Sequence, residues 1–187
     1  MRTFIAIDLP EDVKASIAAC VRRLKPLVSG GVSWARVDDI HLTLKFLGEI
    51  EASSLPAVEQ ALVSAARETD IFTLGVRGTG TFPGGTKRPR VLWVGLTESQ
   101  ALQRFQDRIE TALEGAGFSR EEKPFRPHLT LARVRTASVP SSLIRRLSES
   151  ESAPFGDLVV REAVVYSSRL LPQGPQHEAL FKAALRT

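Results

Sequence analysis

The sequence predicts a mixed α and β protein that is built from two similar lobes. The tetrapeptide His-Leu-Thr-Leu occurs twice, beginning at His41 and at His128, which lie 87 residues apart in a chain of 187. In both halves of the chain, an amphipathic helical pattern precedes the strand that carries this tetrapeptide. A repeat of nearly half the chain indicates a duplicated lobe and not a short-period solenoid. We therefore expect a single domain over residues 1–187, whose two lobes face one another.

The first half of the chain has a regular alternation of strand and helix patterns. A buried apolar run opens it, and a proline followed by two acidic residues then marks the start of a helix. The next segment alternates strictly between polar and apolar residues, as a half-buried strand does. In order, the patterns predict strand, helix, strand, helix and strand over residues 2–8, 11–27, 41–48, 53–68 and 71–78.

The second half begins with a predicted long loop over residues 79–90, which is rich in Gly, Pro and basic residues. Strand and helix patterns then resume. They predict a strand, a helix, the second His-Leu-Thr-Leu strand, a short helix and two further strands over residues 91–96, 98–115, 128–134, 140–149, 158–161 and 163–170.

The composition is that of a globular protein, with 43% hydrophobic and 25% charged residues. The formal net charge is only +4, but acidic and basic residues are unevenly distributed along the chain. This leaves room for a basic surface that meets an anion such as nucleic acid, although the same charges fit an ordinary solvated surface. We expect a protein that folds without a partner and is a monomer.

The chain has one cysteine, Cys20, which excludes an internal disulfide framework and a multi-cysteine zinc site. Cys20 falls in helical step with Val13 and Ile17, so we expect it to pack in the core and not to act as a nucleophile. No apolar run approaches the length of a membrane span, and acidic and proline residues interrupt the short apolar run near the start. We expect a cytoplasmic protein that makes no membrane contact.

Strand alternation predicts that each copy of the tetrapeptide forms one half of a candidate site. Successive side chains of a strand point to opposite faces, so His41, Thr43 and Lys45 share one face while the leucines between them face the core. The second copy places His128 and Thr130 together in the same way. If a pseudo-two-fold axis relates the lobes, the two His-Thr pairs converge across a cleft.

Two imidazoles on opposite sides of a substrate suit acid and base catalysis near neutral pH. Hydroxyl groups of threonine can bind the non-bridging oxygens of a tetrahedral anion, so the combination fits cleavage of a phosphodiester without a metal or cofactor. Two alternatives stand beside this interpretation. The repeat could preserve structure without chemistry, or the two histidines could bind a metal, although few acids and no third histidine lie beside the motifs.

These residues resemble the 2H phosphoesterase superfamily, which is named for two His-x-Thr-x motifs. Within it they are similar to the RNA 2′,3′-cyclic phosphodiesterases, once called 2′-5′ RNA ligases. The resemblance covers nearly the whole chain, through the stretches FIAIDLP, HLTLKFLG with a Trp seven residues before it, FRPHLTLAR and SSRLLPQGP. It implies a bilobal, duplicated α+β fold, in which two antiparallel sheets line a central cleft and helices pack on the outer faces.

The resemblance also implies a reaction and roles for residues. Such enzymes open a terminal 2′,3′-cyclic phosphate without metal to leave a 2′-phosphate, and some run the reverse 2′-5′ joining of RNA ends. His41 would act as the general acid on the departing 3′ oxygen and His128 as the general base on water. Thr43, Thr130 and Arg133 would bind the phosphate. Arg133 lies five residues after His128, so a regular strand points it to the opposite face, and a bulge or strand end is needed to bring it round.

Several further residues are candidates for contact with RNA. Lys45 has the position in the strand alternation that places it on the face of His41, and Arg126 precedes the proline before His128. Phe46 is an aromatic residue that could stack on a base, and Lys87 and Arg88 lie in the basic loop. By pattern alone the aromatic side chain also fits the core.

His177 departs from the family pattern, because His stands where Tyr is frequent in a Gly-Pro-x-Tyr-Glu stretch. We expect it on the surface; the alternative is a third titrating group near the cleft. Two other functions stay open beside an RNA 2′,3′-cyclic phosphodiesterase. One is an enzyme for a small cyclic nucleotide such as ADP-ribose cyclic phosphate, and the other is a protein that binds RNA ends without turnover. The intact motifs disfavour the latter, and the basic loop favours a polymer.

Overall fold

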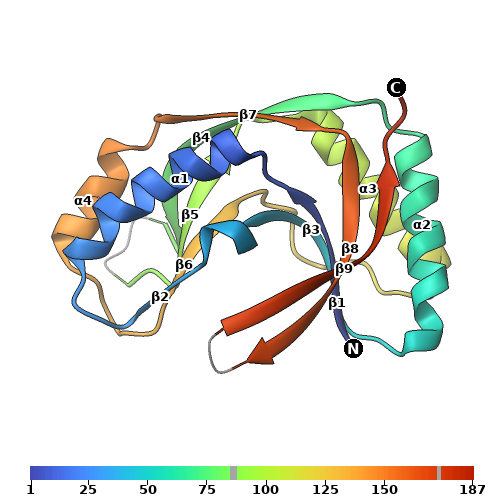
Figure 1. The fold of residues 1–187 in the computed structure, drawn as a ribbon, viewed down its shortest axis with the longest axis horizontal. Coiled ribbons are helices and arrows are strands. Elements are labelled where there is room, and N and C mark those ends of the chain that lie inside the picture. Colours follow the sequence, from blue (N-terminus) through green and yellow to red (C-terminus); the bar gives the residue numbers. More distant parts are fainter. Residues whose placement is uncertain (85–87, 172–173) are drawn as a thin grey trace.

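The computed structural model describes residues 1–84, 88–171 and 174–187. Helices and strands alternate along the chain much as their periodicity predicts (Figure 1). In chain order the elements are β1 (Arg2–Asp8), α1 (Glu11–Leu24), β2 (Val32–Trp34), β3 (His41–Glu49), α2 (Leu55–Arg67), β4 (Phe72–Phe82), β5 (Val91–Leu96), α3 (Gln100–Gly115), β6 (Leu129–Val134), α4 (Ser141–Glu149), β7 (Pro154–Val160), β8 (Glu162–Leu171) and β9 (Gly174–Ala184).

The strands of the described residues form one antiparallel sheet in the order β7-β4-β5-β6-β3-β1-β8-β9, with β2 paired to β6. Its two middle strands, β3 and β6, pair through Leu42 and Leu129 alone. The sheet therefore consists of two halves that meet at a single residue pair. We call β3, β1, β8 and β9 the His41 half-sheet, and β6, β5, β4, β7 and β2 the His128 half-sheet.

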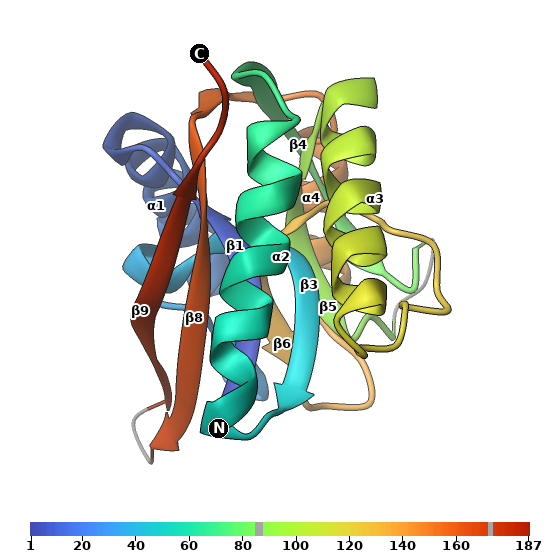
Figure 2. The same cartoon turned by 90° about the vertical axis from the view of Figure 1, so that its right-hand side faces the viewer.

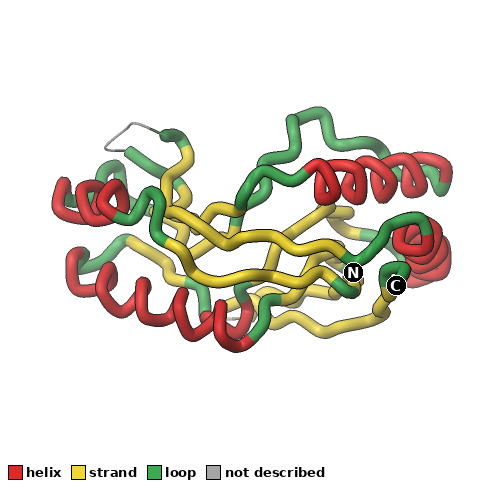
Figure 3. Tube along the Cα trace, turned by 90° about the horizontal axis from the view of Figure 1, so that it is seen from above, coloured by secondary structure: helices red, strands yellow, loops and turns green. Residues whose placement is uncertain are grey.

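The helices cover the two half-sheets at opposite ends of the molecule (Figures 1 and 3). Helix α1 packs against β7 and α4 against β4, whereas α2 packs against β8 and β9 and α3 against β3. Figure 2 shows α2 and α3 side by side in front of the strands. The expected α+β class, with antiparallel strands and helices on the outer side, is confirmed.

Each half-sheet combines segments from both halves of the sequence. Strand β4 joins the His128 half-sheet, while β8 and β9 return to the His41 half-sheet. The return of β8 to the His41 half-sheet is explained by β1, whose inner residues are all buried. A strand of that kind needs a neighbour on each side, and β1 pairs with β3 on one side and β8 on the other.

Two strands and one loop boundary differ from the sequence prediction. Strand β2 has three residues, too few for alternation to be read, and β9 is a polar edge strand that contains proline. Strand β4 continues to Phe82, where the sequence predicts a loop from residue 79. Cross-strand pairing with β5 holds this Gly- and Thr-rich segment extended.

Helix α1 confirms the packing role expected of Cys20. Its buried face comprises Val13, Ile17, Cys20, Val21 and Leu24. Burial raises the pKa of the Cys20 thiol, and the nearby Arg23 opposes this effect. Within the described ranges, no helix combines the length and apolar character that a membrane crossing requires.

Strand β3 contains a bulge at the last residue of its His-Leu-Thr-Leu tetrapeptide. Thr43 pairs with Ala6 of β1 and Lys45 pairs with the preceding residue, Ile5, so Leu44 is the extra residue. The bulge reverses the alternation that follows it. The prediction that Lys45 shares the face of the first histidine is therefore wrong, and Lys45 is only 6% exposed.

Strand β6 carries a bulge at the equivalent position. Thr130 pairs with Trp93 of β5 and Ala132 pairs with Leu92, which makes Leu131 the extra residue. Here too the alternation reverses, so Arg133 lies on the same face of the sheet as Thr130 and is exposed. Arg133 can approach the second motif only if the strand contains a bulge of this kind.

The buried ammonium group of Lys45 is held by a polar network. Its Nζ donates to a Glu110 carboxylate oxygen and to the Ser119 carbonyl, each at 2.8 Å. Glu110 also accepts from the Gln106 side chain at 3.1 Å and from the Glu121 backbone N–H at 3.2 Å. The network joins β3, α3 and the chain that leads to the second motif.

We expect Lys45→Met or Glu110→Leu alone to lower the free energy of unfolding by about 3–5 kcal/mol, because each leaves an unpaired charge in the interior. The double variant should lose much less. Urea denaturation of all three variants measures the coupling. As a control, Lys182→Met breaks the exposed 2.7 Å ion pair with Glu162 and should change stability by at most about 1 kcal/mol. A loss for Lys45→Met no larger than for this control would contradict the prediction.

Candidate active site

The two His-Leu-Thr-Leu tetrapeptides meet in antiparallel orientation at the junction of the half-sheets. Their second residues, Leu42 and Leu129, form the pair that joins β3 to β6. Continuing this register by one residue in each direction sets His41 opposite Thr130, and Thr43 opposite His128. This register would place each imidazole beside the hydroxyl of the other motif, on the face opposite the buried leucines, and Thr43 and His128 do line one cavity.

Both imidazoles are oriented by the same local hydrogen bond. Nδ1 of His41 is 2.8 Å from the Asp39 carbonyl oxygen, and Nδ1 of His128 is 2.7 Å from the Arg126 carbonyl oxygen. A carbonyl oxygen only accepts, so Nδ1 carries the hydrogen in both rings. In the neutral form this leaves Nε2 of each ring as the nitrogen that can exchange a proton with a substrate.

The His41 ring lies in a cluster of aromatic side chains. Phe4 stacks on it with ring centroids 4.8 Å apart and an interplanar angle of 23°. Tyr166 lies nearly parallel at 6.3 Å, and His177 approaches edge-on at 5.4 Å. The ring is thus partly shielded from water by groups of three other strands, β1, β8 and β9.

These surroundings favour the neutral form of His41. Burial is the main cause of its lowered pKa, and the charge of His177 acts in the same direction. The hydrogen bond to the Asp39 carbonyl and the carboxylates of Asp8 and Asp39 act in the opposite sense but do not offset the burial. His41 therefore releases its proton more readily than an exposed histidine does.

His177 is not on the surface, as its sequence context led us to expect. It lies on β9 opposite Ser168 and is half-buried beside His41. Its neighbours Phe4 and His41 lie more than 130 positions earlier, so local sequence does not reveal them. The signal that could have placed it is the tyrosine that is frequent here in the family pattern, because an aromatic residue at this position fits the same ring cluster.

Tyr166 and Asp8 form a further contact in this cluster that the sequence did not suggest. The phenol hydroxyl lies 2.7 and 2.8 Å from the two Asp8 carboxylate oxygens. Burial raises the pKa of Tyr166, and the hydrogen bond to Asp8 adds to the shift. Tyr166 therefore stays neutral and anchors β8 to the end of β1 beside His41.

His128 borders a large open cavity of about 1030 Å³. Phe82 stands edge-on to the His128 ring at 5.0 Å and packs against Trp93 at 5.3 Å. Gly80 lies opposite this tryptophan, and a Cβ there would collide with the indole ring. The aromatic wall beside His128 thus depends on a glycine in the neighbouring strand.

The cavity brings some predicted contact residues together and leaves others apart. Thr43, Phe46 and Arg126 line it together with His128, and Phe46 is 58% exposed in spite of its apolar pattern. Lys45 also lines the cavity, with its ammonium group bound to Glu110.

The remaining predicted contacts lie outside this lining. Arg133 pairs with Val91, whose side chain lines the cavity, and it projects on the face of Thr130. Arg88 is exposed in the segment between β4 and β5, and Lys87 lies outside the described residues.

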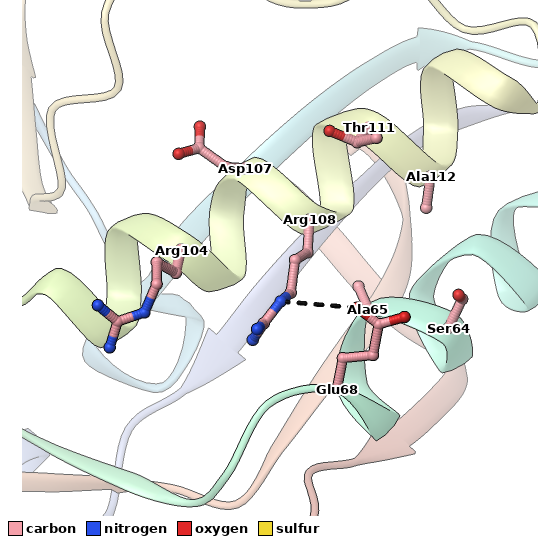
Figure 4. A pocket seen from close by; sticks show the side chains of 8 residues that line it. All are labelled: Ser64, Ala65, Glu68, Arg104, Asp107, Arg108, Thr111 and Ala112. Carbon is pink, nitrogen blue, oxygen red and sulfur yellow. Dashed lines mark ion pairs between the residues drawn. The ribbon is translucent and has the colours of Figure 1, made fainter.

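A smaller cavity of about 410 Å³ lies between α2 and α3, away from both motifs (Figure 4). Arg108 of α3 points toward Glu68, the residue that follows α2, with 3.8 Å between guanidinium nitrogen and carboxylate oxygen. The predicted site residues do not line it. In the described part of the chain, no group of three or more His, Cys, Asp or Glu side chains is arranged to hold a metal ion.

The chain matches a family model over most of its length. The model of the 2′-5′ RNA ligase superfamily matches residues 9–169, which include both motifs. An RNA 2′,3′-cyclic phosphodiesterase of Thermotoga maritima is 32% identical over 182 residues, covering 97% of this chain and 94% of the relative. One of Archaeoglobus fulgidus is 32% identical over 180 residues, covering 96% and 98%.

Solved structures share the fold along the entire chain. The crystal structure of TT0787 of Thermus thermophilus matches with a TM-score of 0.82 and 30% identity, covering 100% of this chain and 98% of that one. The crystal structure of Escherichia coli LigT complexed with 3′-AMP matches with a TM-score of 0.78 and 26% identity at the same coverage.

The Tyr166 contact predicts an alkaline titration well above the ordinary tyrosine pKa of about 10. Tyr166 is the only tyrosine of the chain, so phenolate absorbance reports it alone. Asp8→Asn removes the negative charge beside the hydroxyl and should move the titration to lower pH. Asp157→Asn, at an exposed position of β7, is the matched control and should leave it unchanged. Ionisation of Tyr166 near pH 10 in protein with native circular dichroism would contradict the prediction.

Proposed function

The chain belongs to the 2′-5′ RNA ligase superfamily, which confirms the resemblance in its motifs, and we propose that it is an RNA 2′,3′-cyclic phosphodiesterase. The observation that carries the proposal is the antiparallel meeting of two His-Thr pairs at Leu42 and Leu129. Each pair offers one imidazole, oriented by a backbone carbonyl, and one hydroxyl. The relatives that carry this enzyme name align with nearly the whole chain.

We propose that the reaction hydrolyses a terminal 2′,3′-cyclic phosphate to a 2′-phosphate. His128 takes a proton from water as the water oxygen attacks phosphorus. The bond between phosphorus and the 3′ oxygen breaks, and His41 gives its proton to that oxygen. The lowered pKa of His41 makes its imidazolium a stronger acid for this step.

The phosphate charge is held by Thr43, Thr130 and Arg133 in this proposal. Two hydroxyls and one guanidinium group on one face of the sheet are donors for the non-bridging oxygens as charge develops on them. Because side chains carry out both proton transfers and stabilise the charge on the phosphate, the proposed mechanism uses no metal or cofactor. The near symmetry of the two pairs lets the histidines exchange roles, so we include reversible 2′-5′ joining of RNA ends.

We propose the end of an RNA strand as the substrate. The cavity beside His128 is at the upper end of the roughly 300–1,000 Å³ range of ligand pockets, which favours more than one nucleotide. Phe46 offers an exposed ring for base stacking, and Arg126 offers a charge for the backbone. The alternatives are a small cyclic nucleotide, such as ADP-ribose cyclic phosphate, and binding of RNA ends without turnover. All proposed groups come from one chain, so a monomer suffices.

The central test is hydrolysis of an oligonucleotide that ends in a 2′,3′-cyclic phosphate, in excess chelator. We expect a 2′-phosphate product and a bell-shaped pH dependence. His41→Ala and His128→Ala should each lower kcat by about 10²- to 10⁴-fold, because each removes one proton transfer. Full activity in either variant, or dependence on an added divalent cation, would exclude the mechanism. A cyclic mononucleotide assayed in parallel separates the polymer from the small substrate, and binding without product would favour the RNA-end-binding alternative.

Arg133→Ala should lower kcat/KM by about tenfold to a hundredfold, as expected from loss of one hydrogen bond to a charged group. The control is Arg104→Ala, which removes the same charge from the exposed face of α3 that Figure 4 shows. Its kcat/KM should match that of the unmodified enzyme. Equal losses in the two variants would point to net charge and would remove Arg133 from the site.

A further inference from the structure

A third imidazole approaches the proposed active site from β9. The His177 ring stands at 85° to the His41 ring, with centroids 5.4 Å apart, and is edge-on to Phe4 at 5.0 Å. The Tyr166 ring completes the cluster, with its centroid 6.4 Å from the centroid of the His177 ring. All three histidines of the chain are therefore found at the two motifs or beside them.

The surroundings of His177 determine where its proton sits. Its Nδ1 is buried, and no hydrogen-bond partner for it lies among the described residues. A buried N–H without an acceptor is more costly than a buried lone pair beside aromatic rings, so neutral His177 carries its hydrogen on Nε2. A second proton would have to enter at Nδ1, inside the ring cluster. Burial accordingly lowers the pKa of His177.

Other charged groups face this pair of imidazoles. Asp39 acts on both rings and Asp8 on His41, and each carboxylate favours a protonated ring. Arg2 disfavours a proton on His177, and Tyr166 stays neutral. The carboxylates thus favour one positive charge between the rings, while the short distance opposes two.

We propose that His177 and His41 act as a coupled pair that holds a single positive charge, which makes His177 a positioning residue for proton transfer by His41. Two positive charges 5.4 Å apart repel by an amount equivalent to roughly 0.5–2 pH units, for effective dielectric constants of about 80 down to 20. The pair titrates in two steps that belong to both rings. The catalytic consequence rests on the proposed function, but the coupling itself is a property of the free protein.

The coupling can be measured without substrate. Three histidines give three ring signals in an NMR titration, and the variants His177→Gln and His177→Phe remove the neighbouring charge while keeping, respectively, a polar group or an aromatic edge. In both variants the midpoint of His41 should rise. His41→Gln should likewise raise the midpoint of His177, and because the two rings share one interaction the two rises together should amount to roughly 0.5–2 pH units. The signal of His128 should not move and serves as the internal control.

The coupling would be overturned if the midpoints of His41 and His177 both stayed unchanged when the other histidine is replaced. A rise in His177→Gln without one in His177→Phe would also overturn it, because the cause would then be entry of water and not loss of charge.

The pH dependence of turnover tests the positioning role. With His41 as the acid, activity is lost at high pH as His41 loses its proton, so His177→Gln should move the alkaline limb upward by the NMR shift and leave the acidic limb in place. Movement of the acidic limb alone would support the coupling and assign His41 as the base. If neither limb moves, the positioning role is overturned. Absence of turnover in the unmodified protein would reject the proposed function, while the NMR measurement would still decide the coupling.

Discussion

The pairing of Leu42 with Leu129 is the constraint on which the candidate site depends. It is the contact that joins β3 to β6, and thereby one half-sheet to the other. A slip of one residue in this register would turn the His-Thr face of one strand toward the core and its leucines toward the cavity. The burial of both leucines opposes such a slip, because each is fully enclosed by the core. Hydrophobic packing on one face of the sheet thus sets the geometry of polar chemistry on the other.

Different residues follow the two bulges, so the two sides of the paired motifs are not alike. Each tetrapeptide ends on an extra residue, so the second residue after it emerges on the cavity face of the sheet. That residue is Phe46 in one strand and Arg133 in the other. A ring suited to stacking therefore borders one side of the paired motifs, and a guanidinium group suited to an anion borders the other.

The sequence predicts the parts of this molecule that depend on local pattern. Periodicity places α1, α2, α3 and most strands, and the repeated tetrapeptide indicates the two half-sites. Alternation does not predict the bulges, because a bulge is defined by the partner strand; only the role that the family resemblance implies for Arg133 called for a bulge or strand end after the second motif. Lys45 shows the consequence: its partner Glu110 lies 65 residues away, so its parity suggests an accessible residue while the fold buries it. His177 is missed because its surroundings also depend on distant segments, since Phe4 of β1 and His41 of β3 contact its ring.

Identical motifs need not have identical chemistry, because their neighbours come from segments that do not repeat. His41 is enclosed by Phe4, Tyr166 and His177, which lie on β1, β8 and β9, and its charged form is disfavoured there. His128 instead borders an open cavity beside Phe82. The exchange of strands between the sequence halves creates this difference, since β8 and β9 return to cover only the first motif. Two histidines in identical motifs can in this way have different chemical environments without any change in the motifs themselves.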